Sequence, residues 1–294
     1  MHIKKGLLRN SNEVNLDSTK TFFYVEYSLK AERNGKLSEY WSTEYFKEKE
    51  HLNFKIRVGE WAKIAKDTLV AEPPKPNKDA IVIFTPHVLK EAIIPVIGFH
   101  ASGQSFSEET SAYNINDDVA SKEITLIDDG LLEGGLSSNG WDGEGNPHQK
   151  TVVIKNGIFQ KRLYDQKYAI LNDENPTGNG IRSIFGGIFN GVSNFQIISG
   201  TTALENIISD IKEGYYIEKF SWLNPEKLSG NFGAEIRNGY YIKNGEFQNP
   251  IKLGNVSGNV LEMMKNCLYI SKETEFSENS LFPYMCFSNL TVSF

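Results

Sequence analysis

No two of the chain's five histidines lie three or four residues apart, the spacing at which helical histidines share a metal ion. They are His2, His51, His87, His100 and His148. His87, His100 and His148 could still meet in space with the carboxylates of Asp142 and Glu144 and bind a metal. Nothing in the spacing requires such a site, and His100 is better explained as a surface or packing residue.

Asp142 and Glu144 are separated by one glycine and flanked by Gly140 and Gly145. A functional interpretation makes them a general acid/base pair or part of a loop that contacts a peptide. The simpler interpretation, which we favour, is a glycine-rich turn whose carboxylates accept hydrogen bonds from backbone N–H groups.

Other familiar catalytic and cofactor motifs are missing. Ser102, Ser105 and Ser107 invite a nucleophile hypothesis, but the chain has no Gly-x-Ser-x-Gly motif. The glycine-rich residues 178–187 lack the lysine of a phosphate-binding loop and the dinucleotide fingerprint, so no cofactor is predicted. Cys267 and Cys286 are too few for a disulfide framework and lack metal-ligand spacing.

Composition limits the class of protein. The 294 residues carry a formal charge of -6 with scattered lysines, which argues against nucleic-acid binding. The longest apolar runs, residues 80–84 and 92–99, are far short of the roughly 20 residues that cross a membrane. Residues 1–5 lack the apolar core of a signal peptide, so we expect a cytoplasmic protein.

Two near copies of one stretch predict two β-hairpins. Residues 154–160 read Ile-Lys-Asn-Gly-Ile-Phe-Gln, and residues 242–248 read Ile-Lys-Asn-Gly-Glu-Phe-Gln. Asn-Gly suits a type I′ turn because both of its residues tolerate positive φ. A β-rich core with a weak internal duplication is the simplest account, although two such hairpins can also arise by chance.

Helices and strands are expected elsewhere in no strict alternation. Strands are expected at residues 21–29, 37–43 (after a turn at Asn34-Gly35), 80–84, 123–127, 195–198 and 215–222. Helices are expected at residues 54–69, from Thr85-Pro86 to Pro95 (which would kink or end it), at 102–116, from a cap at Thr201 or Thr202 to Gly214, and at 258–267. Residues 224–233 are expected to form a loop.

This pattern favours an α+β fold in two parts, rich in β-strands, with Asn-Gly hairpins and a few packing helices. The proline-rich residues 72–77 mark the first boundary. We therefore expect an N-terminal α+β region at residues 1–76 and a β-rich domain at residues 77–294.

An ordered series of short motifs resembles the TldD/PmbA family from about Leu8 to the C-terminus. No single motif is specific, but their order and spacing are, apart from a short contraction after Phe232. The series comprises Asp128-Asp129, residues 141–147, the first hairpin, Leu163-Tyr164-Asp165, Ala169, residues 177–180, Gly230-Asn231-Phe232, Gly239-Tyr240 and residues 242–246.

The resemblance implies a two-part α+β fold and an association of TldD-like and PmbA-like subunits into a peptidase for small peptides. TldD-like members bind zinc through a His-Glu-x-x-x-His helix, aided by a cysteine near the C-terminus. At the matching positions this chain has Phe99, His100 and Gln104, so the metal site is absent in its known form. The region matching the ligand cysteine is contracted between Glu273 and Pro283, and Cys286 is not assigned that role.

The chain therefore resembles PmbA-like members, with an N-terminal region that we expect to be short for the family. Our first hypothesis is a subunit without a metal site that holds a peptide by strand addition, while a TldD-like partner supplies zinc. On this view, Gly103, Asn231 and Phe232 are the peptide-binding candidates. Two alternatives are a homo-oligomeric hydrolase with the unfamiliar ligands His87, His100 and Asp142, and a peptide-binding protein without enzymatic activity.

Overall fold

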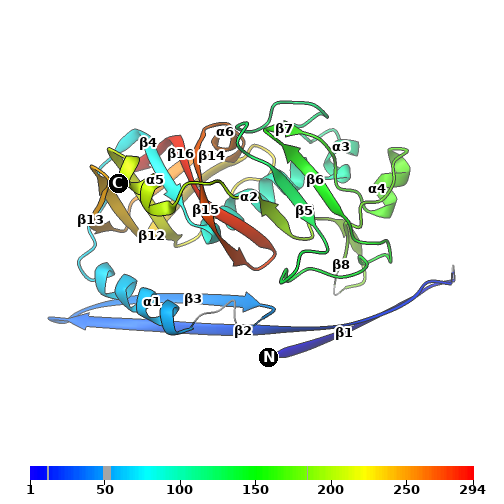
Figure 1. Cartoon of the computed structure of the whole chain (residues 1–294), viewed down its shortest axis with the longest axis horizontal. Helices are drawn as coiled ribbons and strands as arrows, with labels where there is room; N and C mark the ends of the chain where they lie inside the picture. Colours follow the sequence, from blue (N-terminus) through cyan, green and yellow to red (C-terminus); the bar gives the residue numbers. More distant parts are fainter. Residues whose placement is uncertain (12, 49–53, 184) are drawn as a thin grey trace.

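A computed structural model describes residues 1–11, 13–48, 54–183 and 185–294. The N-terminal part is an antiparallel sheet in the order β1-β2-β3, in which β2 is 19 residues long. Its bounds are β1 His2–Arg9, β2 Asn15–Arg33 and β3 Lys36–Phe46, followed by helix α1, Phe54–Thr68. Figure 1 shows this layer running along one side of the remaining structure, with α1 packed on β2 and β3.

The rest of the chain is built around an 11-stranded mixed sheet with the path β13-β12-β11-β4-β16-β10-β5-β6-β7. Strand β14 pairs with both β12 and β16, so β12, β11, β4, β16 and β14 close a ring of strands. The bounds are β4 Asn77–Phe84, β5 Leu126–Asp129, β6 Lys150–Lys155, β7 Ile158–Phe159, β10 Phe195–Ile197, β11 Glu213–Phe220, β12 Asn231–Lys243, β13 Glu246–Ile251, β14 Asn255–Asn259, β15 Cys267–Ser277 and β16 Ser280–Ser293. A separate pair, β8 Gly180–Arg182 and β9 Ile188–Asn190, forms a two-stranded sheet.

Helix α2, Pro86–His100, crosses the middle of this part and buries one face in its main core. The hydroxyl of Thr85 accepts from the Val88 N–H, and Pro86 occupies the first helical position, as the sequence predicts. The shorter helices are α3 Gly103–Ser107, α4 Gln166–Leu171, α5 Leu204–Asp210 and α6 Val260–Lys265. No helix in the described ranges is long and apolar enough to cross a membrane.

The α+β class is confirmed, and so are the predicted turns. Asn34, Asn156 and Asn244 have φ of 51°, 49° and 51°, and the glycine after each also has positive φ. Each pair joins two antiparallel strands, as a type I′ turn requires. The two similar hairpins, β12-β13 and β6-β7, lie at opposite ends of the strand order of the large sheet. Their origin by duplication stays a hypothesis.

Two expectations about helices are wrong, and one of the two alternatives for Pro95 is excluded. Helix α2 continues through Pro95 to His100, so Pro95 does not end it, and only Gly103–Ser107 of the expected helix at 102–116 is helical. Helix α5 starts after Ala203 without a side-chain cap, because Thr202 instead forms a bridge with Ser271 of β15.

The last part of the chain also departs from expectation. Gly214 belongs to β11 and does not end α5, and β12 already begins at Asn231 within the expected loop. Strands β15 and β16 were not anticipated, although β16 is central to the sheet. Pro283 lies inside β16, where a proline normally argues against a central strand. It is tolerated beside a register shift in the pairing with β15.

Candidate functional site

The segment that matches the family's zinc motif lies at the C-terminal end of α2. The His100 ring is buried against the rings of Phe99 and Tyr113, and its Nδ1 accepts from the Ala112 N–H at 2.9 Å. Burial lowers the pKa of His100, so its neutral form is favoured. The side-chain amide of Gln104 donates to Glu108 at 3.0 Å.

These residues do not fit a zinc ion. Phe99 has no ligand atom, and the Nδ1 of His100 is occupied by a backbone N–H. No group of three His, Cys, Asp or Glu side chains in the described part of the chain is arranged to hold a metal. Cys286 is fully buried in strand β16, where burial raises the pKa of its thiol to about 12 and disfavours the thiolate that metals bind.

A groove of about 430 Å³ nevertheless opens at this end of α2. Phe99 and Gln104 line one side, and Phe189 and Asn190 of β9 line the other. Lys227 lies over the Phe99 ring, with its Nζ 5.1 Å from the ring centroid. The lining therefore combines apolar side chains with the charged Glu108 and Lys227, and it includes residues of β9, which pairs with β8.

The peptide-binding candidates lie in different environments. Gly103 is buried against Tyr164, and an added Cβ would come within 2.2 Å of that ring, so the glycine permits close packing. Phe232 is also buried, in the main core. Asn231 is exposed at the start of β12, and its Oδ1 accepts from the Asn259 side chain at 2.9 Å. Two of the three candidates, Gly103 and Phe232, are therefore buried, and Asn231 is exposed.

The carboxylates of Asp142 and Glu144 accept hydrogen bonds from backbone N–H groups of their own loop and of neighbouring segments. Asp142 Oδ1 accepts from the N–H groups of Glu144, Gly145 and Asn146, and its Oδ2 accepts from the Gly180 N–H. Glu144 Oε2 accepts from the Gln166 N–H at the start of α4, and burial raises the pKa of this carboxyl group. Every bond is of the capping kind that the simpler interpretation of this loop describes.

The alternative metal site made of His87, His100 and Asp142 is wrong. His87 and His100 lie in the first and last turns of α2, about 20 Å apart at 1.5 Å per residue. One ion cannot reach both. His87 pairs with Glu91 at 3.4 Å instead, and His51 lies outside the described residues. The three serines cap or bond the backbone around α3, as Ser102 does for the Ser105 N–H.

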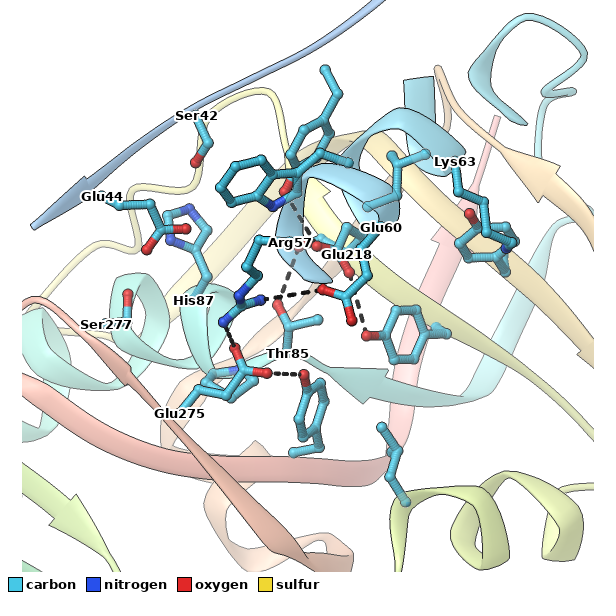
Figure 2. A pocket seen from close by; sticks show the side chains of 18 of the residues that line it. Ser42, Glu44, Arg57, Glu60, Lys63, Thr85, His87, Glu218, Glu275 and Ser277 are labelled. Carbon is cyan, nitrogen blue, oxygen red and sulfur yellow. Dashed lines mark hydrogen bonds and ion pairs between the residues drawn. The ribbon is translucent and has the colours of Figure 1, made fainter. Parts of the chain in front are cut away.

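A second hollow was not anticipated from the sequence. We call it the acidic cleft; it has a volume of about 370 Å³ and lies between the N-terminal layer and the large sheet. Its walls carry the carboxylates of Glu44, Glu60, Glu205, Glu218 and Glu275, and the cations Arg57 and Lys63. Figure 2 shows Arg57 reaching from α1 toward Glu275 of β15, with Glu218 of β11 close by.

The charges of the acidic cleft find partners inside it. Arg57 Nη2 lies 2.7 Å from Glu275 Oε2, and the Tyr284 hydroxyl donates to the other oxygen of Glu275 at 2.5 Å. Glu218 accepts from the hydroxyls of Tyr40 and Tyr216, each at 3.3 Å (Figure 2). These bonds connect β3 and α1 of the N-terminal layer to β11 and β15 of the large sheet.

Burial sets the protonation of these groups. It raises the pKa of Glu218 to about 7, and the nearby charge of Glu275 adds to the shift. Burial lowers the pKa of His87 to about 3, with Lys90 and Lys219 contributing, so His87 is neutral at pH 7. The bonds of the acidic cleft therefore link the two layers, and the carboxyl group of Glu218 has a pKa near neutral pH.

Comparisons with known proteins place this architecture in a class. The family model of the PmbA/TldA metallopeptidase C-terminal domain matches residues 77–294. The chain is 30% identical over 196 residues to a metalloprotease TldD homolog of Buchnera aphidicola, which covers 64% of this chain and 40% of that protein. It is 28% identical over 211 residues to a metalloprotease of Methanocaldococcus jannaschii, covering 71% of this chain and 47% of that protein.

Solved structures agree on the fold. TldE from Thermococcus kodakarensis superposes with a TM-score of 0.89 at 24% identity, covering 99% of this chain and 67% of that one. A protein from Thermotoga maritima gives a TM-score of 0.87 at 20% identity with the same coverage. The chain belongs to the TldD/PmbA family, which is metallopeptidase-related. It spans less than half the length of the two metalloprotease relatives it matches.

Proposed function

We propose that this chain is a PmbA-like subunit, without a metal site of its own, of a TldD/PmbA-type metallopeptidase. It holds small or unfolded peptides in the cytoplasm for proteolysis or peptide maturation, while a TldD-like subunit supplies zinc. The proposal rests on the end of α2. The chain belongs to a metallopeptidase-related family, but the side chains at this end offer no set of metal ligands. An oligomer with a second copy of the chain is the other partnership we consider.

The groove at the end of α2 suits an extended peptide. Strand β9 pairs only with β8 among the described residues, and its Phe189 and Asn190 border the groove. A peptide that adds as a strand forms main-chain hydrogen bonds, which do not depend on its sequence. Selectivity for the side chains of the peptide then comes from the apolar lining, to which Phe99 and Phe189 belong.

The first test is co-expression with the TldD-like chain of the same genome, followed by purification through a tag on this chain. We expect a stable complex whose zinc is removed by a chelator together with its peptidase activity. This chain alone should bind less than one tenth of an equivalent of zinc. If one zinc per chain is retained by this chain alone, the proposal is wrong.

The second test concerns peptide binding. Phe189→Glu places a charge in the apolar lining of the groove and should weaken binding of an unfolded-peptide library by about tenfold or more. Phe185→Glu is the matched control, because Phe185 is 92% exposed and lies outside the groove. Equal affinities for the two variants would show that the peptide does not occupy this groove.

A further inference from the structure

A third hollow, which we call the lysine cavity, lies between the β1–β2 ribbon and the loops around residues 136–148 and 180–193. At about 670 Å³ it falls in the size range of small-ligand pockets. Leu7, Leu8 and Phe22 of the ribbon form one apolar wall. Trp141, Ile181 and Val192 belong to the facing side.

The two walls touch, so the lysine cavity is bounded by packed side chains. The Trp141 ring lies against Gly6, where an added Cβ would be 3.7 Å from the ring. Leu8 packs so closely on Gly145 that a Cβ there would come within 2.8 Å. Gly145 has φ of 97°, a conformation that glycine adopts without strain.

Three lysines, Lys4, Lys20 and Lys47, line the lysine cavity. Lys4 and Lys20 are direct partners across the β1–β2 ladder, and like charges in that position destabilise a sheet. Burial, followed by repulsion from Lys4 and Lys47, lowers the pKa of Lys20 to about 8. Within the described ranges, none of the three makes an ion pair with a carboxylate.

Among the described residues that line the lysine cavity, the acidic side chain is Asp142, and its two oxygens already accept four backbone N–H groups. Arg182 adds a further cation, and burial lowers the pKa of His148 so that its neutral form is favoured. The unbalanced charge and the apolar walls together suit an anion attached to an apolar body.

The lysine cavity adjoins the peptide groove at the end of α2. Ile181 and Val192 line both hollows. The two hollows therefore share part of their wall, which brings the end of a peptide extended along β9 close to the lysine cavity. The group of a peptide that is always anionic and always terminal is its C-terminal carboxylate.

We propose that the lysine cavity binds the free C-terminal carboxylate of a peptide that ends in an apolar residue. Lys4, Lys20 and Lys47 bind the carboxylate, and the last side chain packs between Phe22 and Trp141. This inference rests on the proposed function, because it specifies which end of the peptide the chain recognises. It makes the chain selective for peptide ends over internal segments of folded proteins.

The test is calorimetric titration of the full chain with acetyl-Ala-Ala-Ala-Ala-Phe as the free acid and as the C-terminal amide. We expect the free acid to bind about tenfold more tightly, and added salt to reduce this preference because it screens the charges. Lys20→Gln should remove most of the preference. Lys5→Gln should keep it, because Lys5 lies on the paired strand β1, is exposed and is outside the lysine cavity.

The outcomes distinguish failure of the carboxylate site from failure of the proposed peptide binding. Equal binding of acid and amide overturns the carboxylate site and leaves peptide binding intact. No binding of either peptide overturns both. Inorganic phosphate that binds with the same dependence on Lys20, while acid and amide remain equal, would assign the lysine cavity to a phosphate ligand and also overturn the inference. Circular dichroism of Lys20→Gln and Lys5→Gln checks that both variants fold.

Discussion

The acidic cleft and the lysine cavity both lie under the N-terminal sheet, but they differ in where their charges find partners. In the acidic cleft, Arg57 faces Glu275 at 2.7 Å and tyrosine hydroxyls donate to Glu218 and Glu275. In the lysine cavity, Lys4 and Lys20 face each other, and neither makes an ion pair with a carboxylate of the described residues. Removing one partner of a pair inside the protein is costly, whereas charges left without partners cost stability themselves and are available to a ligand.

The largest effect is expected from the wall of the acidic cleft. Trp61 is 3% exposed and stacks on Tyr27 with ring centroids 3.5 Å apart. Trp61→Ala should lower the free energy of unfolding by about 3–5 kcal/mol, as other buried tryptophans do. Urea denaturation measures it, with Trp222→Ala as control, since Trp222 is 76% exposed. Equal losses would contradict the packing of α1 on the N-terminal sheet.

The next effect tests whether the charges of the acidic cleft are structural. Arg57→Met leaves Glu275 and Glu44 without their cation in a half-buried place, and should cost about 2 kcal/mol in unfolding free energy. Lys63→Met is the control, because Lys63 is 68% exposed, pairs with Asp67 one turn away and lies over the Tyr240 ring. The control should lose about 0.5 kcal/mol or less. A neutral Arg57→Met would remove the contrast between the two hollows.

The pH dependence of stability reports on Glu218. Because its pKa in the folded chain is about 7, above its ordinary value of 4.5, the folded state holds more protons between these pH values. Its contribution is therefore present below pH 4.5 and is lost as the pH rises through 7. Glu218→Gln should reduce the fall in unfolding free energy between pH 5 and 8 by about 1 kcal/mol, a value discounted for solvent screening.

Asp128 complicates this experiment in a predictable way. Burial raises its pKa to about 7 as well, despite hydrogen bonds from Asn179 and Ser193. Part of the pH slope should consequently remain in Glu218→Gln, and the difference between the variant and the parent chain isolates Glu218. An unchanged slope would show that Glu218 titrates at its ordinary pKa.

The smallest effect on stability is expected in the lysine cavity. Lys20→Gln removes one of two like charges that face each other across the ladder, so unfolding free energy should change by no more than about 0.5 kcal/mol, or rise. Thermal denaturation at low salt gives the sharpest measurement, because salt screens the repulsion. A loss above about 1 kcal/mol would give Lys20 a structural role and break the comparison.

Local features of the fold could be predicted because neighbouring residues determine them. The Asn-Gly turns require positive φ at two adjacent residues, and the start of α2 requires only Thr85 and Pro86. The family also followed from a series of short motifs in order. The prediction of the cap of α5 from neighbouring residues failed because of a contact with a distant strand: Thr202 forms a bridge with Ser271 of β15 instead of capping the helix.

The candidate sites also contain features that the sequence determined and features that only the tertiary structure decided. The sequence by itself determined that residues 99–104 contain no His-Glu-x-x-x-His motif, because ligand chemistry belongs to the side chains themselves. Only the tertiary structure decided that Arg57 meets Glu275 across 218 residues, and Tyr40 meets Glu218 across 178. It also decided that the lysines of a local hairpin face loops more than 100 residues away. Such pairs are set by the stacking of the N-terminal layer on the large sheet, and no periodicity or spacing along the chain encodes that contact.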